Sequence, residues 1–468
     1  MAMGTRKQRE RQEHLWIASD AIVQTPGHAF YDRLNQLLAE GGFDRKVEHL
    51  CRRYYTGPKG RPSMAPGVYF RALFVGYFEG LDSERGIAWR VADSLSLRKF
   101  LGYGLDETTP DHSTISRTRR LFDLSTHRAV FGWVLQRVNE AGLLGKTTAI
   151  DATPLEANAA MRSIVRRDTG QGYDEYLKGL AAAAGIENPT PEQRARFDRK
   201  RKKKTSNKDW KHPHDPDARI TKMKDGRTRL AHKAEHAVDL TSGALRAITL
   251  QPADTGDTWS VFETLAATDE MAGLAGAAVI EELVTDKGYH SDDVLVQLHD
   301  LDVRSYVAEP DRGRRRWKGR RNAQTRVYAN RRRLRGNRSK QLHRKRAELA
   351  ERSNAHMYET GGMRRLHLRG RQNIEKRLLI HGAGFNLGLI LRKRSGFGTP
   401  RSMQGVRSRL SARALAAIRH YRVVGDLLHA LKSLNSTIYA WRRGRAPTSS
   451  THVDPHFYHG QLKYRVDW

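Results

Sequence analysis

Residues 232–254 of the chain, HKAEHAVDLTSGALRAITLQPAD, contain two runs of small and aliphatic residues on either side of Thr241-Ser242-Gly243. Polar turn residues between two such runs predict a β-hairpin. Upstream, the β-branched run at 146–150, KTTAI, leads into Asp151 and predicts another strand. The sequence therefore indicates one strand, a long interruption, and then a hairpin.

Helical and strand-like segments alternate after the hairpin. We expect, in order, a helix from Trp259 to about Ala272, a strand that ends at Asp286, a helix from Asp292 to about Leu298, and a short strand in VRSYVAEP at 303–310. The order β, ββ, α, β, α, β predicts a mixed sheet flanked by helices on both faces, which is an α/β fold. Such a sheet can bring the ends of two neighbouring strands together.

Residues 28–145 have the pattern of helices. Ser63 and Pro66 begin a helix through GVYFRALFVGYFEGL, which Gly80 ends, and a second helix is expected from Ser83 through GIAWRVADSLSLRKFLGY. At 108–123, TTPDHSTISRTRRLFD, a turn at Pro110 precedes a helix that Asp111 or Ser113 can cap.

The first turns of that helix have a polar, cationic surface, made by Ser113, Thr114, Ser116, Arg117, Arg119 and Arg120. Such a surface is typical of a helix that enters a DNA groove in a helix-turn-helix. The alternative is an ordinary helical hairpin with a solvated basic side.

The charge of the chain indicates a polyanionic partner. In 468 residues, enough for two or three domains, 84 Lys and Arg stand against 51 Asp and Glu, a net charge of +33. No apolar run approaches the roughly 18 residues that span a bilayer. The charged start, MAMGTRKQRERQEHLW, lacks the apolar core of a signal peptide. We therefore expect a cytoplasmic protein with no membrane association.

Two stretches have many basic residues and little apolar periodicity, one at about 160–230 and one at 312–346, where 17 Lys or Arg occur without an acid. We expect loops or arms that become ordered on a phosphate backbone. Trp317 and Tyr328 in the second stretch can stack on unpaired bases or anchor the arm to the protein. After residue 396 the patterns are helical.

Other residues of metal-ligand type give a weaker signal. The single cysteine, Cys51, excludes an internal disulfide and a zinc site built from thiolates of one chain, and we expect a buried, neutral thiol. His212, His214, Asp215 and Asp217 lie in HPHDPDAR without a second ligand cluster. Ordering of the loop before the hairpin is the expected role of this group.

Two acids, Asp151 and Asp286, each end a short apolar strand and are followed by small or polar residues. A buried carboxylate is costly unless it is paired, and two close together repel each other, so a hard divalent cation resolves the conflict. Mg²⁺ beside a phosphate backbone fits oxygen ligands of this kind. The structural alternative is that Asp151 caps a turn and Asp286 pairs with Lys287 or a nearby Arg.

A third carboxylate is expected from a helix packed against this edge. Glu348 and Glu351 lie three residues apart on the helix that follows the basic stretch, and Glu359 is two turns further on. Spacing does not choose among them. His290, four residues past Asp286, is a candidate for a phosphate contact or for a surface or capping role.

Several blocks, in this order, resemble the DDE transposases of bacterial insertion sequences, most closely the IS1182 group within the IS4/IS5 set. They are GRPSMAPGVYFRALFVGYFEGLDSERGIAWR, TPDHSTISRTRRLF, AIDATPLEANAA, DPDAR, HKAEHAVDL, VTDKGYHS, ERSNAHMYETGGMRR and RGRQNIEKRLLIHGAGFNLGLILR, and they extend over residues 30–395.

The resemblance implies an RNase H-like, retroviral-integrase-like catalytic domain at 146–395, with basic insertions near 160–230 and 312–346. A helical DNA-binding domain at 1–145 and a helical extension at 396–468 would flank it. The catalytic and metal-binding acids would be Asp151, Asp286 and Glu351. They would hold two Mg²⁺ ions, for which Mn²⁺ can substitute.

By the same resemblance the protein would bind terminal inverted repeats in double-stranded DNA, cut the strand with metal-activated water and transfer the freed end to target DNA. It would act as a homo-oligomer on the bacterial nucleoid. The expected DNA contacts are Ser113, Thr114, Arg117, Arg119, Arg120, Lys287, Arg346, Arg364 and Arg365.

Two residues depart from the family pattern. Tyr358 stands seven residues after Glu351, where a lysine is expected, and Asn354 stands where an aromatic residue is expected. These departures support an alternative, a catalytically inactive or domesticated DNA-binding protein derived from a transposase.

Overall fold

A computed structural model describes residues 29–55, 63–201, 205–223, 225–311, 313 and 315–404. The chain divides into two compact units, Met1–Met403 and Gln404–Trp468, and the description below concerns the first. The helical extension expected at 396–468 lies outside the described residues from 405 onward.

A mixed sheet forms the centre of the unit. Its strands are β1 (Thr147–Glu156), β4 (Arg219–Lys222), β5 (Thr228–Asp239), β6 (Leu245–Pro252), β7 (Glu282–Thr285) and β8 (Arg304–Val307). The order is β4-β5-β1-β7-β8, and β6 pairs with β5. β5 is antiparallel to β1, β4 and β6, whereas β7 runs parallel to β1 and β8 runs parallel to β7. The predicted hairpin at 232–254 and the predicted mixed α/β sheet are confirmed.

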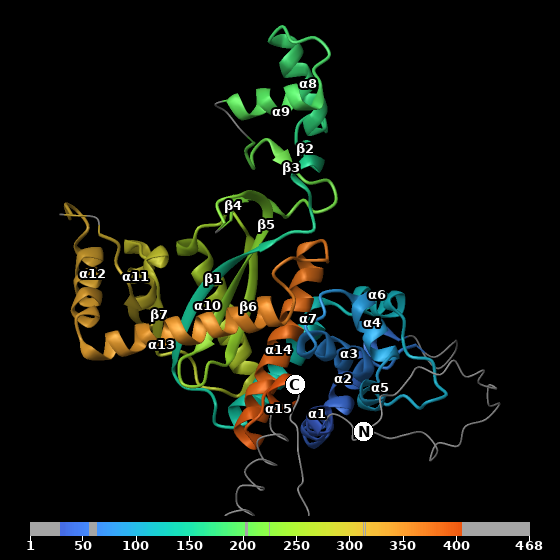
Figure 1. The fold of residues 1–468 in the computed structure, drawn as a ribbon. Helices are drawn as coiled ribbons and strands as arrows, with labels where there is room; N and C mark the ends of the chain where they lie inside the picture. The colour runs from blue at the N-terminus through green and yellow to red at the C-terminus, as the bar shows by residue number, and fades with distance from the viewer. Residues whose placement is uncertain are drawn as a thin grey trace, which may run out of the picture. The chain divides into compact units, whose positions relative to one another are not determined.

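Helices cover both faces of this sheet. On one face α10 (Asp257–Ala275) packs on β5 and β6, and on the other α13 (Asn337–Asn354) runs across β1, β5 and β7 (Figure 1). Glu235 and His236 are adjacent on β5 and alternate between the faces, so Glu235 meets α10 and His236 meets α13. Beyond β7, α11 (Asp292–Asp300) and α12 (Arg321–Leu334) pack on β8.

The N-terminal region is helical, as expected. Its helices are α1 (Ala29–Glu40), α2 (Phe43–Cys51), α3 (Pro66–Phe78), α4 (Glu84–Ala92), α5 (Leu95–Leu101), α6 (His112–Leu121) and α7 (Leu124–Glu140), with a 3-10 turn, η1, at Arg52–Tyr54. α14 (Arg371–Ser395) contacts α3, α7 and β6, so that one apolar core runs from Phe30 to Leu391.

Two local expectations for these helices have clear outcomes. The single helix expected after Ser83 is two helices, because Ser94 accepts a hydrogen bond from the Leu97 N–H and starts α5. Cys51 is fully buried, and burial raises the pKa of its thiol to about 12, which confirms the neutral thiol.

The stretch at 160–230 is not the irregular arm that we expected. It contains η2 (Met161–Ser163), β2 (Val165–Arg166), α8 (Tyr173–Ala183), α9 (Pro191–Lys200) and β3 (Trp210–Lys211). Ala157, Ile164, Trp210, Ala218 and Leu230 form a small core of their own. Its few apolar residues gather around Trp210, whose ring lies 5.1 Å from those of Tyr173 and Tyr176, and such a cluster leaves no periodicity in the sequence.

The second basic stretch is largely helical too, because it contains α12 and the start of α13. Val327 and Asn330 are fully buried and fix α12 against β8, where Asn330 bonds the backbone of Val307. Trp317 packs partly buried against the core, 6.1 Å from the ring of Tyr328, and so anchors the segment. No helix in the described part of the chain is long and apolar enough to cross a membrane.

Candidate active site

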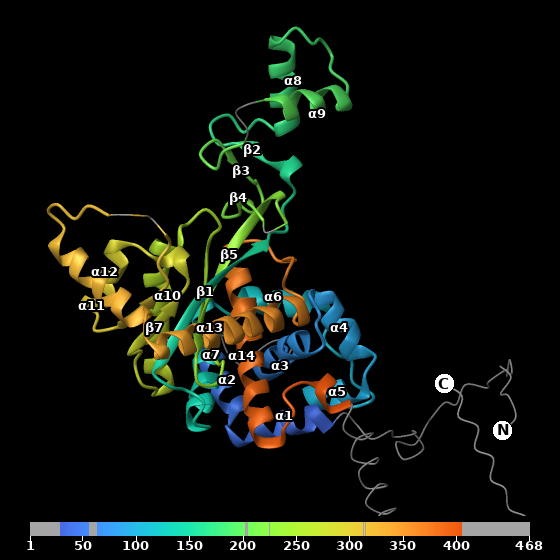
Figure 2. The same ribbon diagram turned by 60° about the vertical axis from the view of Figure 1, so that its left-hand side comes forward.

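We expected both aspartates to end a strand, but β1 continues to Glu156, so Asp151 lies in the middle of its strand and Asp286 alone of the two follows a strand end. The strands that carry them, β1 and β7, are paired. The parallel register joins Thr147 to Glu282, Thr148 to Leu283 and Ala149 to Val284. Continued two residues further, this register sets Asp151 level with Asp286. Figure 2 shows β1 and β7 side by side, and neighbouring strands lie about 4.8 Å apart, so this continued register would place the two residues next to each other where β7 ends.

Asp151 is held by α13. Its Oδ1 accepts a hydrogen bond from Arg346 Nη1 at 3.0 Å, and its Oδ2 accepts one from Asn354 Nδ2 at 3.0 Å. The side chains of Arg346 and Asp151 are 19% and 21% exposed, so this ion pair is largely shielded from water. The guanidinium of Arg346 therefore provides the positive charge next to Asp151 that we expected a metal ion to provide.

Asp286 directly follows β7 and begins the 3-10 turn η3 (Lys287–Tyr289). Its Oδ1 accepts a hydrogen bond from the Gly288 N–H at 2.9 Å, which fixes the side chain at the end of the strand. Asp286 is half-buried, whereas Lys287 is exposed.

A pocket of about 310 Å³ opens beside Asp151 along α13 and the turn after it. Glu351 and Glu359 both line it, and Arg346, Asn354 and Arg364 do so too. Glu348 does not line it and instead pairs with Arg352. The structure thus brings Glu351 and Glu359 to Asp151, but within the described residues no three His, Cys, Asp or Glu side chains lie close enough together to hold one ion.

These acids suit a hard divalent cation, since all of their donors are carboxylate oxygens. Arg346 must then leave Asp151 for that cation to bind, because both compete for the same oxygen. The fit is therefore one of donor chemistry and strand register, and it requires the Arg346 side chain to move away from Asp151.

A π-helical turn, η4 (Ala355–Thr360), follows α13 and changes which side chains face the pocket. In a continuous α-helix Tyr358 would follow Asn354 on the pocket face. The wider turn puts Glu359 there, and Tyr358 is buried with its hydroxyl 2.5 Å from His236 Nε2. Of the two family departures, Asn354 therefore bonds Asp151 directly and Tyr358 bonds His236, which pairs with Asp151 across the sheet; spacing in the sequence does not reveal this.

The candidate DNA helix α6 is capped as expected, because Asp111 accepts a hydrogen bond from the Thr114 N–H at 2.7 Å. Arg117 and Arg120 are exposed, and Ser113 and Thr114 are half-buried. We expected Arg119 on the surface of this helix, and that expectation is wrong. Its exposed fraction is 8%, and its side chain pairs with Glu84 of α4 at 2.7 Å. Its charge holds the two helices together.

Of the other expected DNA contacts, Arg346 and Arg364 line the pocket. Lys287, Arg364 and Arg365 are exposed. Arg364 Nε donates to Glu359 at 2.9 Å, and Arg365 lies 3.8 Å from Glu156 at the end of β1. Arg346 and Arg364 are therefore the expected DNA contacts that line the same pocket as Asp151.

Residues 18–121 match a transposase domain, the family model DUF772. The matched segment ends at the last residue of α6 and so contains the helical hairpin with the exposed arginines. The match supports a transposase, an enzyme that acts on DNA. No curated protein and no solved structure gave a match.

The histidines near these elements have structural roles. Asp215 and His232 are both buried, and their Oδ2 and Nε2 atoms lie 3.1 Å apart, so the loop before the hairpin is tied to β5. The rings of His212 and His214 meet edge to face, with centres 5.9 Å apart. His290 is 1% exposed and therefore does not have the surface role that we considered.

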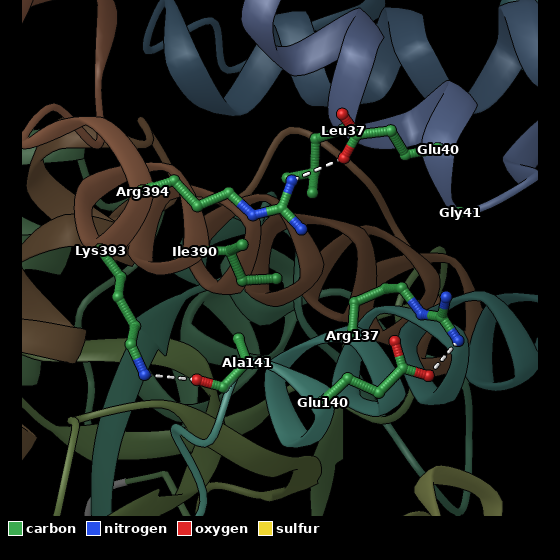
Figure 3. Close-up of a pocket in the computed structure, with 9 residues that line it drawn as sticks. All are labelled: Leu37, Glu40, Gly41, Arg137, Glu140, Ala141, Ile390, Lys393 and Arg394. Atoms are coloured by element: carbon green, nitrogen blue, oxygen red, sulfur yellow. Dashed lines mark hydrogen bonds and ion pairs between the residues drawn. The ribbon is translucent and has the colours of Figure 1, made fainter.

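A further pocket, of about 420 Å³, lies between α1, α7 and α14 and away from these acids (Figure 3). Its charges satisfy one another: Arg394 pairs with Glu40 at 2.6 Å, and Arg137 pairs with Glu140. Lys393 donates to the Ala141 carbonyl.

Substitution of Arg346 tests the competition at Asp151. We expect Arg346→Gln to bind Mn²⁺ about tenfold more tightly in the absence of DNA, because a neighbouring guanidinium disfavours a second cation at a carboxylate by at least that factor. Electron paramagnetic resonance of free Mn²⁺ measures this. Arg352 on the same helix pairs with Glu348, so Arg352→Gln is the control. Equal affinities in both variants would contradict the expectation.

His236 makes the fold sensitive to acid. Burial lowers the pKa of His236 from 6.5 to about 3, so below pH 6.5 the unfolded chain takes up a proton that the folded chain does not. Stability is therefore complete above pH 6.5 and falls as the pH drops toward 3, by about 2 kcal/mol at pH 5. We expect a smaller fall in urea-unfolding free energy between pH 7 and 5 for His236→Asn than for the wild type, whereas His299→Asn at an exposed site leaves the fall unchanged.

Proposed function

We propose that the chain is a DDE transposase of the IS1182 group that binds terminal inverted repeats and carries out metal-dependent strand cleavage and strand transfer. The observation that carries the proposal is the register that sets Asp151 level with Asp286 at one sheet edge, beside a pocket that Glu351 lines. The transposase-domain match in the helical region supports it independently.

An RNase H-like catalytic region at 146–395 is part of the proposal. The hairpin β5–β6 on one side of β1 and the parallel strands β7 and β8 on the other support it. Strand β1 is then the central strand and carries the first acid, and β7 ends in the second.

Asp151, Asp286 and Glu351 would hold two Mg²⁺ or Mn²⁺ ions, which supply activation of water and neutralisation of charge at the scissile phosphate. The rest of the site positions the DNA. Arg364 lines the pocket, and Arg365 and Lys287 are exposed as well, so that these cations can bind phosphates near the cut. Arg346, once it leaves Asp151, can bind one as well.

The helical region at 1–145 would bind the repeats through α6, where Arg117 and Arg120 are exposed. The net charge of +33 gives strong, salt-dependent binding to duplex DNA. Two transposon ends must be handled together, so we include a homo-oligomer on nucleoid DNA in the proposal.

A second function is an inactive, transposase-derived DNA-binding protein. It is favoured by the contacts of Asp151, whose two oxygens are bound by Arg346 and Asn354. In that case Asp151 would hold α13 against the sheet and would bind no metal ion, so that the protein would bind DNA without cutting it.

Cleavage of a labelled duplex that carries the inverted repeats flanking the gene separates the two functions. With purified protein, we expect strand cutting at the repeat boundary in Mg²⁺ and none in EDTA. Tight binding of the repeats without cutting in Mg²⁺ or Mn²⁺ would establish the DNA-binding protein instead.

A further inference from the structure

A group of buried polar side chains lies beneath the sheet edge and is not needed for binding an ion directly. Its centre is Glu235 on β5, which is fully buried and is paired in register with Ala152, the residue after Asp151. Lys233, two residues earlier on the same face of β5, is 7% exposed. We call Lys233, Glu235, Asp257, Ser260, Thr264 and Tyr289 the β5 polar cluster.

Glu235 has an unusually complete set of partners. Its Oε1 accepts hydrogen bonds from Ser260 Oγ at 2.5 Å and from Tyr289 Oη at 3.1 Å, and its Oε2 accepts one from Thr264 Oγ1 at 2.5 Å. Lys233 Nζ lies 3.6 Å away and balances the charge. A buried carboxylate costs several kcal/mol unless it is bonded in this way, and apolar residues would pack the same space without that cost. The cluster therefore calls for a role other than core packing.

Tyr289 connects the cluster to Asp286, which lies three residues before it. The tyrosine follows β7, whereas Glu235 belongs to β5, and β1 lies between these two strands. The hydrogen bond therefore passes beneath the strand that carries Asp151 and ties together the elements on its two sides. Burial, and then the charge of Glu235, raise the pKa of Tyr289, so its hydroxyl remains a donor.

Lys233 of β5 supports the same turn through Asp257, the first residue of α10. Its Nζ donates to Asp257 Oδ1 at 2.9 Å. A Cβ added at Gly288 would lie 2.8 Å from Asp257 Oδ2 and 3.1 Å from Asp286 Oδ1, so the turn after Asp286 packs directly on the start of α10. The turn is thus held at Gly288 by Asp257 and at Tyr289 by Glu235.

We propose that Lys233, Glu235 and Tyr289 are positioning residues that hold Asp286 level with Asp151 for the binding of a divalent cation. The proposal rests on the proposed function and extends it to residues that touch neither the ion nor the DNA. Residues that orient the ligands of a metal typically change its affinity by about 10- to 100-fold when they are replaced.

The test compares Tyr289→Phe with Tyr306→Phe. Tyr306 is also buried, and its hydroxyl donates to Glu282 at the other end of β7, 3.4 Å away, so both variants lose one buried hydroxyl bonded to a carboxylate. We expect Tyr289→Phe to weaken Mn²⁺ binding at least about tenfold in electron paramagnetic resonance and to raise the Mg²⁺ concentration for half-maximal cleavage similarly. Repeat binding and melting temperature should match those of Tyr306→Phe.

The outcomes are distinguishable. If Asp286→Asn weakens Mn²⁺ binding and Tyr289→Phe changes it no more than Tyr306→Phe does, the positioning role is overturned while the proposed function stands. If Asp286→Asn also leaves Mn²⁺ binding and cleavage unchanged, both are overturned. Should Tyr289→Phe not fold, Glu235→Gln, which removes the negative charge and one of the two acceptor oxygens from the cluster, is judged by the same criteria.

Discussion

Replacement of Asp286 by asparagine is expected to lower the rate of strand cleavage at the repeat boundary by about a thousandfold or more. Catalytic metal ions contribute several kcal/mol of transition-state stabilisation, and about 4 kcal/mol corresponds to a thousandfold in rate. Asparagine keeps the shape of the side chain and its cap on the Gly288 N–H. Single-turnover cleavage of the labelled duplex in Mg²⁺ measures the effect.

The control for this variant is Asp123→Asn, another aspartate that caps the helical turn after it, here α7 in the N-terminal region. It should cleave at the wild-type rate. Both variants should bind the repeats with wild-type affinity, because neither exchange removes a cation that contacts phosphate. Wild-type cleavage by Asp286→Asn would contradict the assignment of this edge as the active site.

The second large effect concerns stability. Substitution Glu84→Ala is expected to lower the free energy of unfolding by about 3–5 kcal/mol, because it leaves the guanidinium of Arg119 buried without its partner. The two side chains are only 9% and 13% exposed, at a separation of 2.7 Å. Urea-induced unfolding of the N-terminal helices, followed by the fluorescence of Trp89 and Trp133, measures the loss.

An exposed ion pair in the same region serves as the control. Lys99 and Asp32 are 76% and 56% exposed, so Asp32→Ala should change the free energy of unfolding by less than about 1 kcal/mol. A loss of similar size in both variants would show that the pair between α4 and α6 does not hold these helices together.

Much of the sheet could be predicted because its strands leave local signals. The turn at Thr241-Ser242-Gly243 and the apolar runs that end at Asp151 and Asp286 each depend on a few consecutive residues. Their alternation with helices then restricts how the strands can be ordered. The level placement of the two aspartates follows from that order together with the parallel register.

The rest depends on contacts between distant residues. Arg119 resembles its exposed neighbours in the sequence, and only the packing of α4 shows that it pairs with Glu84. The small core around Trp210 draws residues from 157 to 230 and has no period to detect. The bonds of Arg346 and Asn354 to Asp151 join residues about 200 positions apart, beyond the reach of any local pattern.

The π-helical turn at Ala355–Thr360 has a consequence for how this chain is aligned with other proteins. Such a turn acts as a one-residue insertion in an α-helix, so a comparison that counts residues from Glu351 without a gap is out of step by one from Ala355 onward. With the gap included, the place of the seventh residue belongs to Glu359, which bonds Arg364, and not to Tyr358. The lysine of the family pattern is absent from that place as well, and the cation bonded to the residue there is Arg364.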